Sequence, residues 1–367
     1  MLLDDITLSM VEGIGSGTVQ KLLDAFGSST AVLDGFSRTE VNRFDFLKPE
    51  TAQRLLSARK NINPEPVLEL CRRKNIGIIP LSDPQYPEQL RSIHDPPFLL
   101  YIQGKILPQD SFSLAVIGTR RITSYGRRTT EKLTKALVAN CFTVNSGLAL
   151  GIDSVAHRSA LKYGGRTLAV LGSGHCRLYP PEHRELAEQI ASSGGAVISE
   201  HPPLHPSASW TFPQRNRIVS GLSLGVLVVE APLRSGAMIT ARLAGEQGRD
   251  IFTVPGPIDS EVSRGCHQLL RNGAYLAESV DDILNVLGPM NRPVLLPGFE
   301  KPVQHPNELS LNEIEAKVLR HIGAKPATLQ ELAAAAGLEI QQIAAVISVL
   351  EEKRIVRRTT PDKWMRI

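Results

Sequence analysis

From residue 112 to residue 287, short apolar runs alternate with stretches whose apolar residues recur at helical spacing. Continuous apolar strands that alternate with helices are typical of a parallel sheet covered by helices on both faces. We therefore predict an α/β fold, an extended Rossmann-like doubly wound core whose sheet is mostly parallel. The expected strands are FSLAVIG (112–118), FTVNSG (142–147), RTLAVLGSG (166–174), GAVISE (195–200), LGVLVVEA (224–231), DIFTVPG (250–256) and AYLAES (274–279). Between these strands, helices are expected to begin near Tyr125, Ile152, Pro181 and Ala237, and a further helix is expected around Cys266.

Two segments precede the strand and helix alternation. Residues 1–62 have a helical pattern, and we expect them to form a small helical domain. Within them, Gly13, Gly15 and Gly17 form a turn similar to the helix–hairpin–helix (SAM-like) type, whose backbone N–H groups can approach a phosphate. A purely structural helical hairpin explains this turn equally well. The proline-rich residues 83–104 end in FLLYIQG, which we expect to form an edge strand of the core or a lead-in to it.

Two further segments follow the core domain, which we place at residues 63–287. Residues 288–310 are rich in proline and lack periodicity, so we predict an interdomain linker. Residues 311–367 give three helical stretches and a short hairpin, the order of a winged-helix domain. The third stretch has no basic residue before Lys353, so we predict that it does not read duplex sequence and that the domain has an accessory or protein-contacting role. Cations in the hairpin leave weak nonspecific DNA contact open: Arg354, Arg357, Arg358, Lys363 and Arg366.

The overall composition is ordinary for a soluble protein, and 367 residues suggest two or three domains. No apolar run approaches the ~20 residues of a membrane span, and the acidic N-terminal stretch lacks the basic start of a secretion signal. We therefore expect a cytoplasmic protein without membrane contact. The four cysteines lie far apart and form no CxxC pair, which argues against a zinc ribbon or a disulfide framework. We expect no metal and no cofactor.

The charge of the chain is unevenly distributed. The formal net charge is only +4, yet residues 110–221 carry 13 Lys and Arg against 7 Asp and Glu. A basic segment in a nearly neutral protein indicates an anionic partner, although a solvated surface with a chance imbalance would give the same count.

The loops that follow the predicted strands share a composition. Each contains glycine near the start of a helix, as in residues 118–126, 145–157, 171–174, 231–241 and 254–258, and all but the last also contain serine or threonine. The carboxyl ends of parallel strands meet at one edge of a sheet, where ligands bind, and such loops present N–H groups that suit phosphate oxygens. The pattern therefore predicts a polyanion or nucleotide site. Arg177 stands where a dinucleotide fingerprint needs its third glycine, and no Walker lysine motif occurs.

Several residues at this edge are candidates for anion binding. Arg120 directly follows the first strand and can clamp a phosphate with two hydrogen bonds. Ser146 and Gly147 would supply a hydroxyl and an N–H to the same anion. Asp153 and His157 lie one helical turn apart, and we interpret them as a structural pair rather than a metal or catalytic site, because no third ligand is evident.

The stretch FPQRNRIVSG (212–221) predicts the start of a buried helix. We expect the Arg215–Arg217 segment to reach the mouth of the same site, with Phe212 presenting a ring face. Cations combined with an aromatic ring hold single-stranded nucleic acid, by charge for the backbone and by stacking for the bases. The alternative is a core phenylalanine with the arginines paired to Glu200 or Glu230.

Several long motifs in fixed order resemble the DNA-processing protein A (DprA/Smf) family over roughly residues 65–287. They are VIGTRRITSYG (116–126), SGLALGIDSVAH (146–157), FPQRNRIVSGLS (212–223), SGAMITA (235–241) and VPG (254–256) followed by SRGCHQLLRNGA (263–274). The resemblance implies an extended Rossmann fold that binds single-stranded DNA and is not known as an enzyme. It also implies a role in natural transformation, in which the protein protects incoming strands and loads the RecA recombinase over single-strand-binding protein, commonly as a homodimer.

The resemblance and the strand-end loops together give a set of candidate residues. The predicted nucleic-acid-binding residues are Gly118, Thr119, Arg120, Ser146, Gly147, Gly172, Gly174, Phe212, Arg215, Asn216, Arg217, Ser235 and Gly236. His183 and His267 stand where family members often have asparagine, so local hydrogen bonding and its pH response would differ if those asparagines support the pocket. A second hypothesis is a nucleotide (phosphoribo)hydrolase on the same core, with Glu230 or Asp153 activating water, although no paired carboxylates occur near one strand end.

Overall fold

The computed structural model describes residues 2–37, 39, 44–288, 313–319, 321–322, 327–352, 356–360 and 363–366. Contacts between residues divide the chain into two compact units, Met1–Pro293 and Val294–Ile367, and each is described by itself. The helices of residues 1–62 belong to the same unit as the large sheet, so their status as a separate domain stays a prediction. Apart from residue 288, the predicted linker lies outside the described residues.

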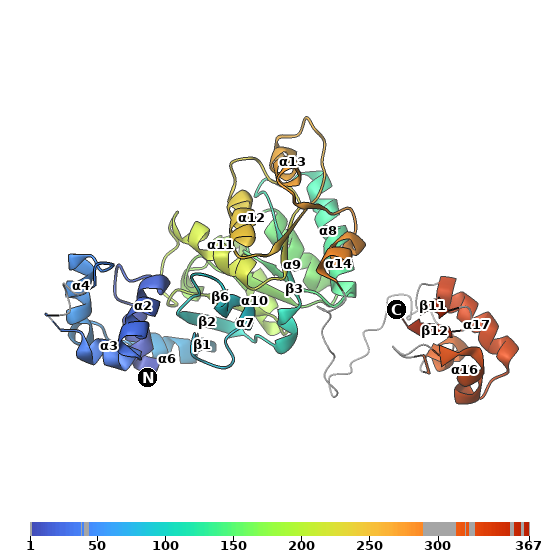
Figure 1. Ribbon diagram of the computed structural model, residues 1–367, viewed down its shortest axis with the longest axis horizontal. Coiled ribbons are helices and arrows are strands. Elements are labelled where there is room, and N and C mark those ends of the chain that lie inside the picture. The colour runs from blue at the N-terminus through green and yellow to red at the C-terminus, as the bar shows by residue number, and fades with distance from the viewer. Residues whose placement is uncertain are drawn as a thin grey trace. The chain divides into compact units, whose positions relative to one another are not determined.

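The described residues of the larger unit form a nine-stranded sheet (Figure 1). Its strands are β1 (Ile76–Pro80), β2 (Leu99–Gly104), β3 (Ser113–Ile117), β4 (Thr143–Ser146), β5 (Thr167–Val170), β6 (Ala196–Ser199), β7 (Gly225–Val228), β8 (Asp250–Thr253) and β9 (Tyr275–Leu276). The strand order across the sheet is β1-β2-β6-β5-β4-β3-β7-β8-β9. The neighbouring strands β6-β5-β4-β3-β7-β8-β9 are parallel to one another, and β2 is antiparallel to both of its neighbours, β1 and β6. The predicted mostly parallel α/β core is therefore confirmed, and each predicted strand of the core contains one observed strand.

The expected position of FLLYIQG in the sheet needs a correction. This segment forms β2, which lies inside the sheet between β1 and β6, and β1 takes the edge position. β1 has the sequence IGIIP, and Ile76 is its one buried residue. A strand this short, with glycine and proline and without alternating burial, carries a weak strand pattern. Proline is tolerated in it because an edge strand does not need every N–H for pairing.

Helices cover both faces of the sheet (Figure 1). The core helices are α8 (Ser124–Ala139), α9 (Ile152–Lys162), α10 (Arg184–Ser192), α11 (Thr211–Gly221), α12 (Gly236–Glu246), α13 (Arg264–Arg271) and α14 (Val280–Leu287), with the 3-10 helices η1 (Pro108–Ser111), η2 (His175–Arg177), η3 (Pro181–His183) and η4 (Glu261–Ser263). On one face, α8, α9 and α14 pack against Leu114 and Val116. On the other face, α11, α12 and α13 pack against Ala115 and Ile117. Alternate residues of β3 thus face opposite helical layers, as a sheet buried on both faces requires.

The helices nearest the N-terminus share a hydrophobic core with β2. The helices that precede β2 along the chain are α1 (Leu2–Ser9), α2 (Ser16–Phe26), α3 (Ser29–Gly35), α4 (Pro49–Leu56), α5 (Ala58–Asn61), α6 (Glu65–Arg73) and α7 (Glu88–Arg91). Ile6 and Leu22 are fully buried and belong to one cluster with Leu99 and Tyr101 of β2. In the turn between α1 and α2, Gly13 has a φ of +88°, a conformation that favours glycine.

The smaller unit has the order of helix, helix, helix and hairpin, which confirms the predicted winged-helix domain. Its elements are α15 (Glu313–Leu319), β10 (Ala327–Thr328), α16 (Leu329–Ala336), α17 (Ile340–Glu352), β11 (Val356–Thr360) and β12 (Lys363–Arg366), and the strand order is β10-β12-β11. Arg354 lies outside the described residues, and DNA contact by the hairpin stays a prediction.

Within the described ranges, no single helix is long and apolar enough to cross a membrane; the bent pair of α16 and Ile340–Glu351 passes that test by length and composition only.

Candidate nucleic-acid interface

A cavity of about 580 Å³ lies at the carboxyl ends of β3 and β4. Its walls come from the loops after β3, β4 and β7 and from helices α9, α11 and α12. The strands that follow β3 along the chain are β4, β5 and β6, and they lie on one side of it in the sheet. The next strands, β7, β8 and β9, lie on its other side. β3 therefore marks the topological switch point, where open α/β sheets bind their ligands.

Most of the predicted nucleic-acid-binding residues line this cavity. They are Gly118, Thr119, Arg120, Gly147, Phe212, Arg215, Asn216, Ser235 and Gly236. Helix α11 contributes Phe212, Arg215, Asn216 and Val219, at spacings of three, four and seven residues from the first, and also Pro213. That spacing defines one face of a helix, so one side of α11, with Pro213 beside it, forms this wall of the cavity. DNA contact by these residues stays a prediction.

The mouth of the cavity carries exposed cations. Arg120 and Arg121 are both exposed, and the guanidinium carbon of Arg120 lies 5.5 Å from the centre of the Phe212 ring, within the range of a cation–π contact. Backbone hydrogen bonds hold their loop: the Thr119 N–H donates to the Glu230 carbonyl at 2.7 Å. A cation and an aromatic ring are therefore presented side by side on a fixed loop and a fixed helix.

Arg215 is a buried cation in the cavity wall. It is only 4% exposed, and its Nη1 donates to the carbonyl oxygens of Gly147 and Val170. Burial lowers the pKa of Arg215 to about 10, although the Asp153 carboxylate opposes this, so the guanidinium is charged at neutral pH. Burial also raises the pKa of Asp153, against the effects of Arg215 and of the Gly147 and Ala149 N–H groups, which donate to its carboxylate. The predicted anion donor, the Gly147 N–H, is thus already engaged with Asp153.

Four of the predicted nucleic-acid-binding residues do not line the cavity: Ser146, Gly172, Gly174 and Arg217. Ser146 is the last residue of β4, and its buried hydroxyl donates to the Val116 carbonyl at 2.6 Å, so it is not presented to an anion as we expected. Gly172 lies behind Phe212, where a Cβ would come within 2.9 Å of the ring. Gly174 lies in the loop after β5, and its N–H donates to the His205 carbonyl in the loop after β6 at 2.9 Å. These residues support the walls instead of lining them.

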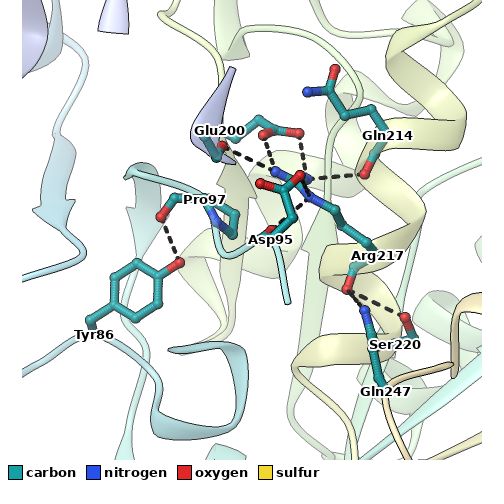
Figure 2. A network of polar contacts seen from close by, with 9 residues as sticks. Tyr86, Asp95, Pro97, Glu200, Gln214, Arg217, Ser220 and Gln247 are labelled. Atoms are coloured by element: carbon teal, nitrogen blue, oxygen red, sulfur yellow. Dashed lines mark hydrogen bonds and ion pairs between the residues drawn. The ribbon is translucent and has the colours of Figure 1, made fainter. Parts of the chain in front are cut away.

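Arg217 is the fourth predicted residue that does not line the cavity, and it lies in a network of polar contacts with Glu200 and Asp95 (Figure 2). Its Nη1 and Nη2 donate to the Glu200 carboxylate at 2.9 and 2.7 Å, and its Nε donates to the carbonyl and carboxylate of Asp95 at 2.9 and 3.2 Å. Burial alone lowers the pKa of Arg217, but these carboxylates outweigh burial and the pKa is raised. The expectation that Arg217 reaches the mouth beside Arg120 is therefore wrong. Residues two apart on a helix lie roughly 200° apart around its axis, so Arg217 cannot share the face of Arg215.

The sequence analysis missed an aromatic residue beside the cavity. Tyr179 is 48% exposed, and its ring centre lies 5.6 Å from that of Phe212, with the two planes at 55°. It lines a small recess that Arg120, Phe212 and Arg215 also line. The signal that could have revealed it is its position in the loop after the predicted third strand, at the same edge of the sheet as the candidate cations. Two aromatic rings therefore stand beside Arg120.

The carboxylates of the hydrolase hypothesis have structural partners. Glu230 accepts hydrogen bonds from the backbone N–H and the hydroxyl of Thr123, the residue before α8. His157 is fully buried with its Nδ1 2.7 Å from the Thr167 hydroxyl, and burial lowers its pKa to about 3. The geometry agrees with the interpretation of Asp153 and His157 as structural residues. Within the part of the chain that the structure describes, no group of three His, Cys, Asp or Glu residues is placed to hold a metal ion.

His183 and His267, which the sequence analysis singled out, both lie within hydrogen-bond distance of loop carbonyls. Nδ1 of His183 lies 2.8 Å from the carbonyl oxygen of Leu148, in the loop between β4 and α9. Nε2 of His267 lies 3.0 Å from the carbonyl oxygen of Gly256. A neutral imidazole donates one hydrogen bond, as an amide can, so each histidine can support its loop in the same manner.

A doubly wound sheet with a cation-bearing cavity at its switch point defines a Rossmann-like ligand-binding protein. The family model described as DNA recombination-mediator protein A matches residues 77–288, and the model described as DprA winged helix domain matches residues 302–359. The chain belongs to the DprA/Smf family of DNA recombination mediators.

Individual relatives agree with this assignment. The chain is 36% identical to Protein Smf of Synechocystis over 344 residues, which is 86% of each chain. It is 40% identical to DNA processing protein DprA of Bacillus subtilis over 226 residues, 61% of this chain and 76% of the relative. The solved structure of Streptococcus pneumoniae DNA processing protein A matches with a TM-score of 0.64 at 32% identity, over 77% of this chain and 95% of that chain. The solved structure of DNA processing protein A from Helicobacter pylori matches with a TM-score of 0.52 at 30% identity, over 58% of this chain and 95% of that chain.

Proposed function

We propose that the cavity binds the sugar-phosphate backbone of single-stranded DNA and that the protein acts in natural transformation. In this role it protects incoming single strands and loads the RecA recombinase over single-strand-binding protein, working as a homodimer. Two relatives support the proposal. The Bacillus subtilis protein is named a DNA processing protein, and the Helicobacter pylori structure is described as giving a single-stranded DNA binding mode.

The observation that carries the proposal is the contact between Arg120 and Phe212 at the cavity mouth. Arg120 is exposed and can turn its guanidinium to a phosphate, while Phe212 and Tyr179 offer ring faces to unpaired bases. Arg215 adds a fixed positive charge in the wall behind them. In a duplex the bases are stacked on one another, so these rings favour a single strand.

The number of cations in the cavity sets the expected salt dependence. Because Arg217 is engaged with acids, the cavity cations are Arg120, Arg121 and Arg215. Three phosphate contacts predict a slope of about −2 for log affinity against log salt, since each contact with a single strand contributes roughly −0.7. A fourfold rise in salt should then weaken binding roughly 20-fold.

The test compares full-length wild type with Arg120→Ala by fluorescence anisotropy on an oligothymidylate and on a duplex. The variant should bind the single strand roughly 10- to 100-fold more weakly, the range for one charged hydrogen-bonded contact, and its salt slope should be shallower by about 0.7. Arg73→Ala is the control, because Arg73 is also exposed but lies on α6, outside the cavity. An unchanged affinity and slope for Arg120→Ala, or equal binding of duplex and single strand, would refute the proposal.

A further inference from the structure

A second cavity, of about 670 Å³, lies in the larger unit on another side of α11. It shares no lining residue with the first cavity within the described part of the chain. The turn between α1 and α2 forms one wall, the start of β2 forms another, and residues 200–214 close it. Trp210 and Gln214 of the α11 region line it, four residues apart and therefore on one face of the helix. The first turns of α11 thus separate the two cavities.

Four aromatic side chains line the second cavity: Phe98, and three that contact one another, His201, His205 and Trp210. The imidazole rings of His201 and His205 are stacked, with centres 4.2 Å apart and planes at 11°. The Trp210 ring meets both edge-on, with its centre 6.3 and 6.1 Å from theirs. Trp210 is 58% exposed, so much of its side chain is open to a ligand. The two stacked rings form a defined surface in the loop between β6 and α11.

Two ring nitrogens of these histidines are buried and have no hydrogen-bond partner among the described residues: Nε2 of His201 and Nδ1 of His205. His201 is only 9% exposed, and leaving a buried polar atom unpaired costs about 1–3 kcal/mol. Burial lowers the pKa of His201 to about 4, so its ring is neutral at physiological pH. A neutral imidazole recognises a ligand by one donated and one accepted hydrogen bond, not by charge. These features suit a flat heteroaromatic ring with polar edges.

The opposite wall of the second cavity is the start of helix α2. Gly13, Gly15 and Ser16 line it, and no side chain caps the helix at Gly15. A Cβ at Gly15 would meet nothing within 4 Å, so the backbone there is open to close approach. Backbone N–H groups at a helix start suit a phosphate oxygen. The cavity therefore offers aromatic and hydrogen-bonding groups on one side and an anion-binding backbone on the other.

We propose that this second cavity binds one nucleotide of the same single strand, with its base against Trp210 and the two histidines and its phosphate at the start of α2. The inference rests on the proposed function and extends it. A strand that leaves the first cavity beside Phe212 reaches the second by crossing the start of α11 at Trp210. The helical N-terminal segment then contributes to the binding site through its glycine-rich turn.

The test uses full-length protein and oligothymidylates of increasing length. For strands long enough to occupy both cavities, Trp210→Ala should weaken binding roughly 5- to 150-fold, the range for the loss of one stacked base. His201→Phe keeps the ring and removes its nitrogens, and it should weaken binding of the same strands roughly 2- to 10-fold, as for one hydrogen bond. Neither variant should alter the affinity of the shortest strands that bind. Leu204→Ala is the control, because Leu204 is an exposed residue of the same loop that does not line the cavity.

A spectroscopic readout tests the stacking directly. The chain has two tryptophans, and Trp364→Phe leaves Trp210 as the only one. Its emission should be quenched by long strands and unaffected by the shortest ones. If Arg120→Ala weakens binding while Trp210→Ala and His201→Phe have no effect at any strand length, this inference fails and the proposed function stands. If wild-type protein binds no single strand, both fail.

Discussion

The position of Arg217 leads to a prediction that separates a structural arginine from a DNA-contacting one. Replacing it in Arg217→Met removes the guanidinium and leaves the Glu200 carboxylate, whose side chain is 6% exposed, without its ion-pair partner. Asp95 loses the same partner, and its Oδ1 is buried, but its side chain is 39% exposed, so water can reach part of it. The cost of the substitution should therefore come mainly from Glu200.

The expected size of the effect follows from the burial of the pair. Removing one partner of a buried ion pair destabilises a protein by about 3–5 kcal/mol, because the other charge stays buried and unpaired. For a unit of this size each kcal/mol lowers Tm by roughly 2–4 °C, so the transition should fall by roughly 10 °C. The double variant Glu200→Leu, Arg217→Met removes both charges, and it should recover most of the loss.

Two assays on each variant distinguish a structural role of Arg217 from a contact with DNA. Thermal unfolding followed by circular dichroism gives the stability of the larger unit, and a salt titration with a short oligothymidylate gives the phosphate contacts of the first cavity. Arg217→Met should have a lower Tm and an unchanged salt slope, whereas Arg120→Ala should keep its Tm and lose about 0.7 from the slope. The reasoning is refuted if Arg217→Met unfolds at the wild-type temperature while its slope becomes shallower.

Two further predictions concern the walls and the core. In Gly147→Ala the new Cβ would lie 2.4–2.6 Å from the Arg215 guanidinium, so Tm and single-strand affinity should both fall, while Gly236→Ala, with nothing within 4 Å of its Cβ, should keep its Tm in the same thermal scans. The folded pKa of His157, about 3, is below its ordinary value, so its contribution to stability is present above pH 6.5 and is lost as the pH falls toward 3. Urea unfolding should give a decline of about 1.4 kcal/mol per pH unit from this group below pH 6.5. His157→Gln should remove that part of the slope, and an identical acid decline in the variant would contradict the assignment.

The sheet could be predicted from the sequence because its strands are buried on both faces. Runs such as SLAVI of β3 are apolar at every position but one, and that pattern differs from the helical spacing around it. β1 was missed because the same physical signal is absent: one residue of IGIIP is buried, and the strand owes its place to backbone pairing with β2. Pairing with a neighbour that is distant along the chain leaves little trace in local composition.

The site could be located but not fully resolved. Loops with glycine and serine at strand ends indicated the correct edge of the sheet, because parallel strands bring their carboxyl ends together. The sequence did not predict the directions in which the polar groups of these loops point. Ser146 still belongs to β4, so its hydroxyl is bonded inside the sheet, and the Gly147 N–H is bonded to an aspartate that composition alone could not connect to it. Helical spacing applied to residues 212–221 would have separated Arg217 from Arg215.

The order of residues in α11 has a physical explanation once its two faces are distinguished. On one face, Arg215 is hydrogen-bonded to carbonyls after β4 and within β5; on the other, Arg217 binds acids after β6 and before β2 and contacts Ser16 of α2 at 3.3 Å. Buried groups fix the helix from both sides, so Phe212 and Trp210 are held in place before any strand arrives. A preorganised surface loses less conformational entropy on binding. Arg217 therefore serves the site without touching it, because the helix that it fixes forms a wall of both cavities.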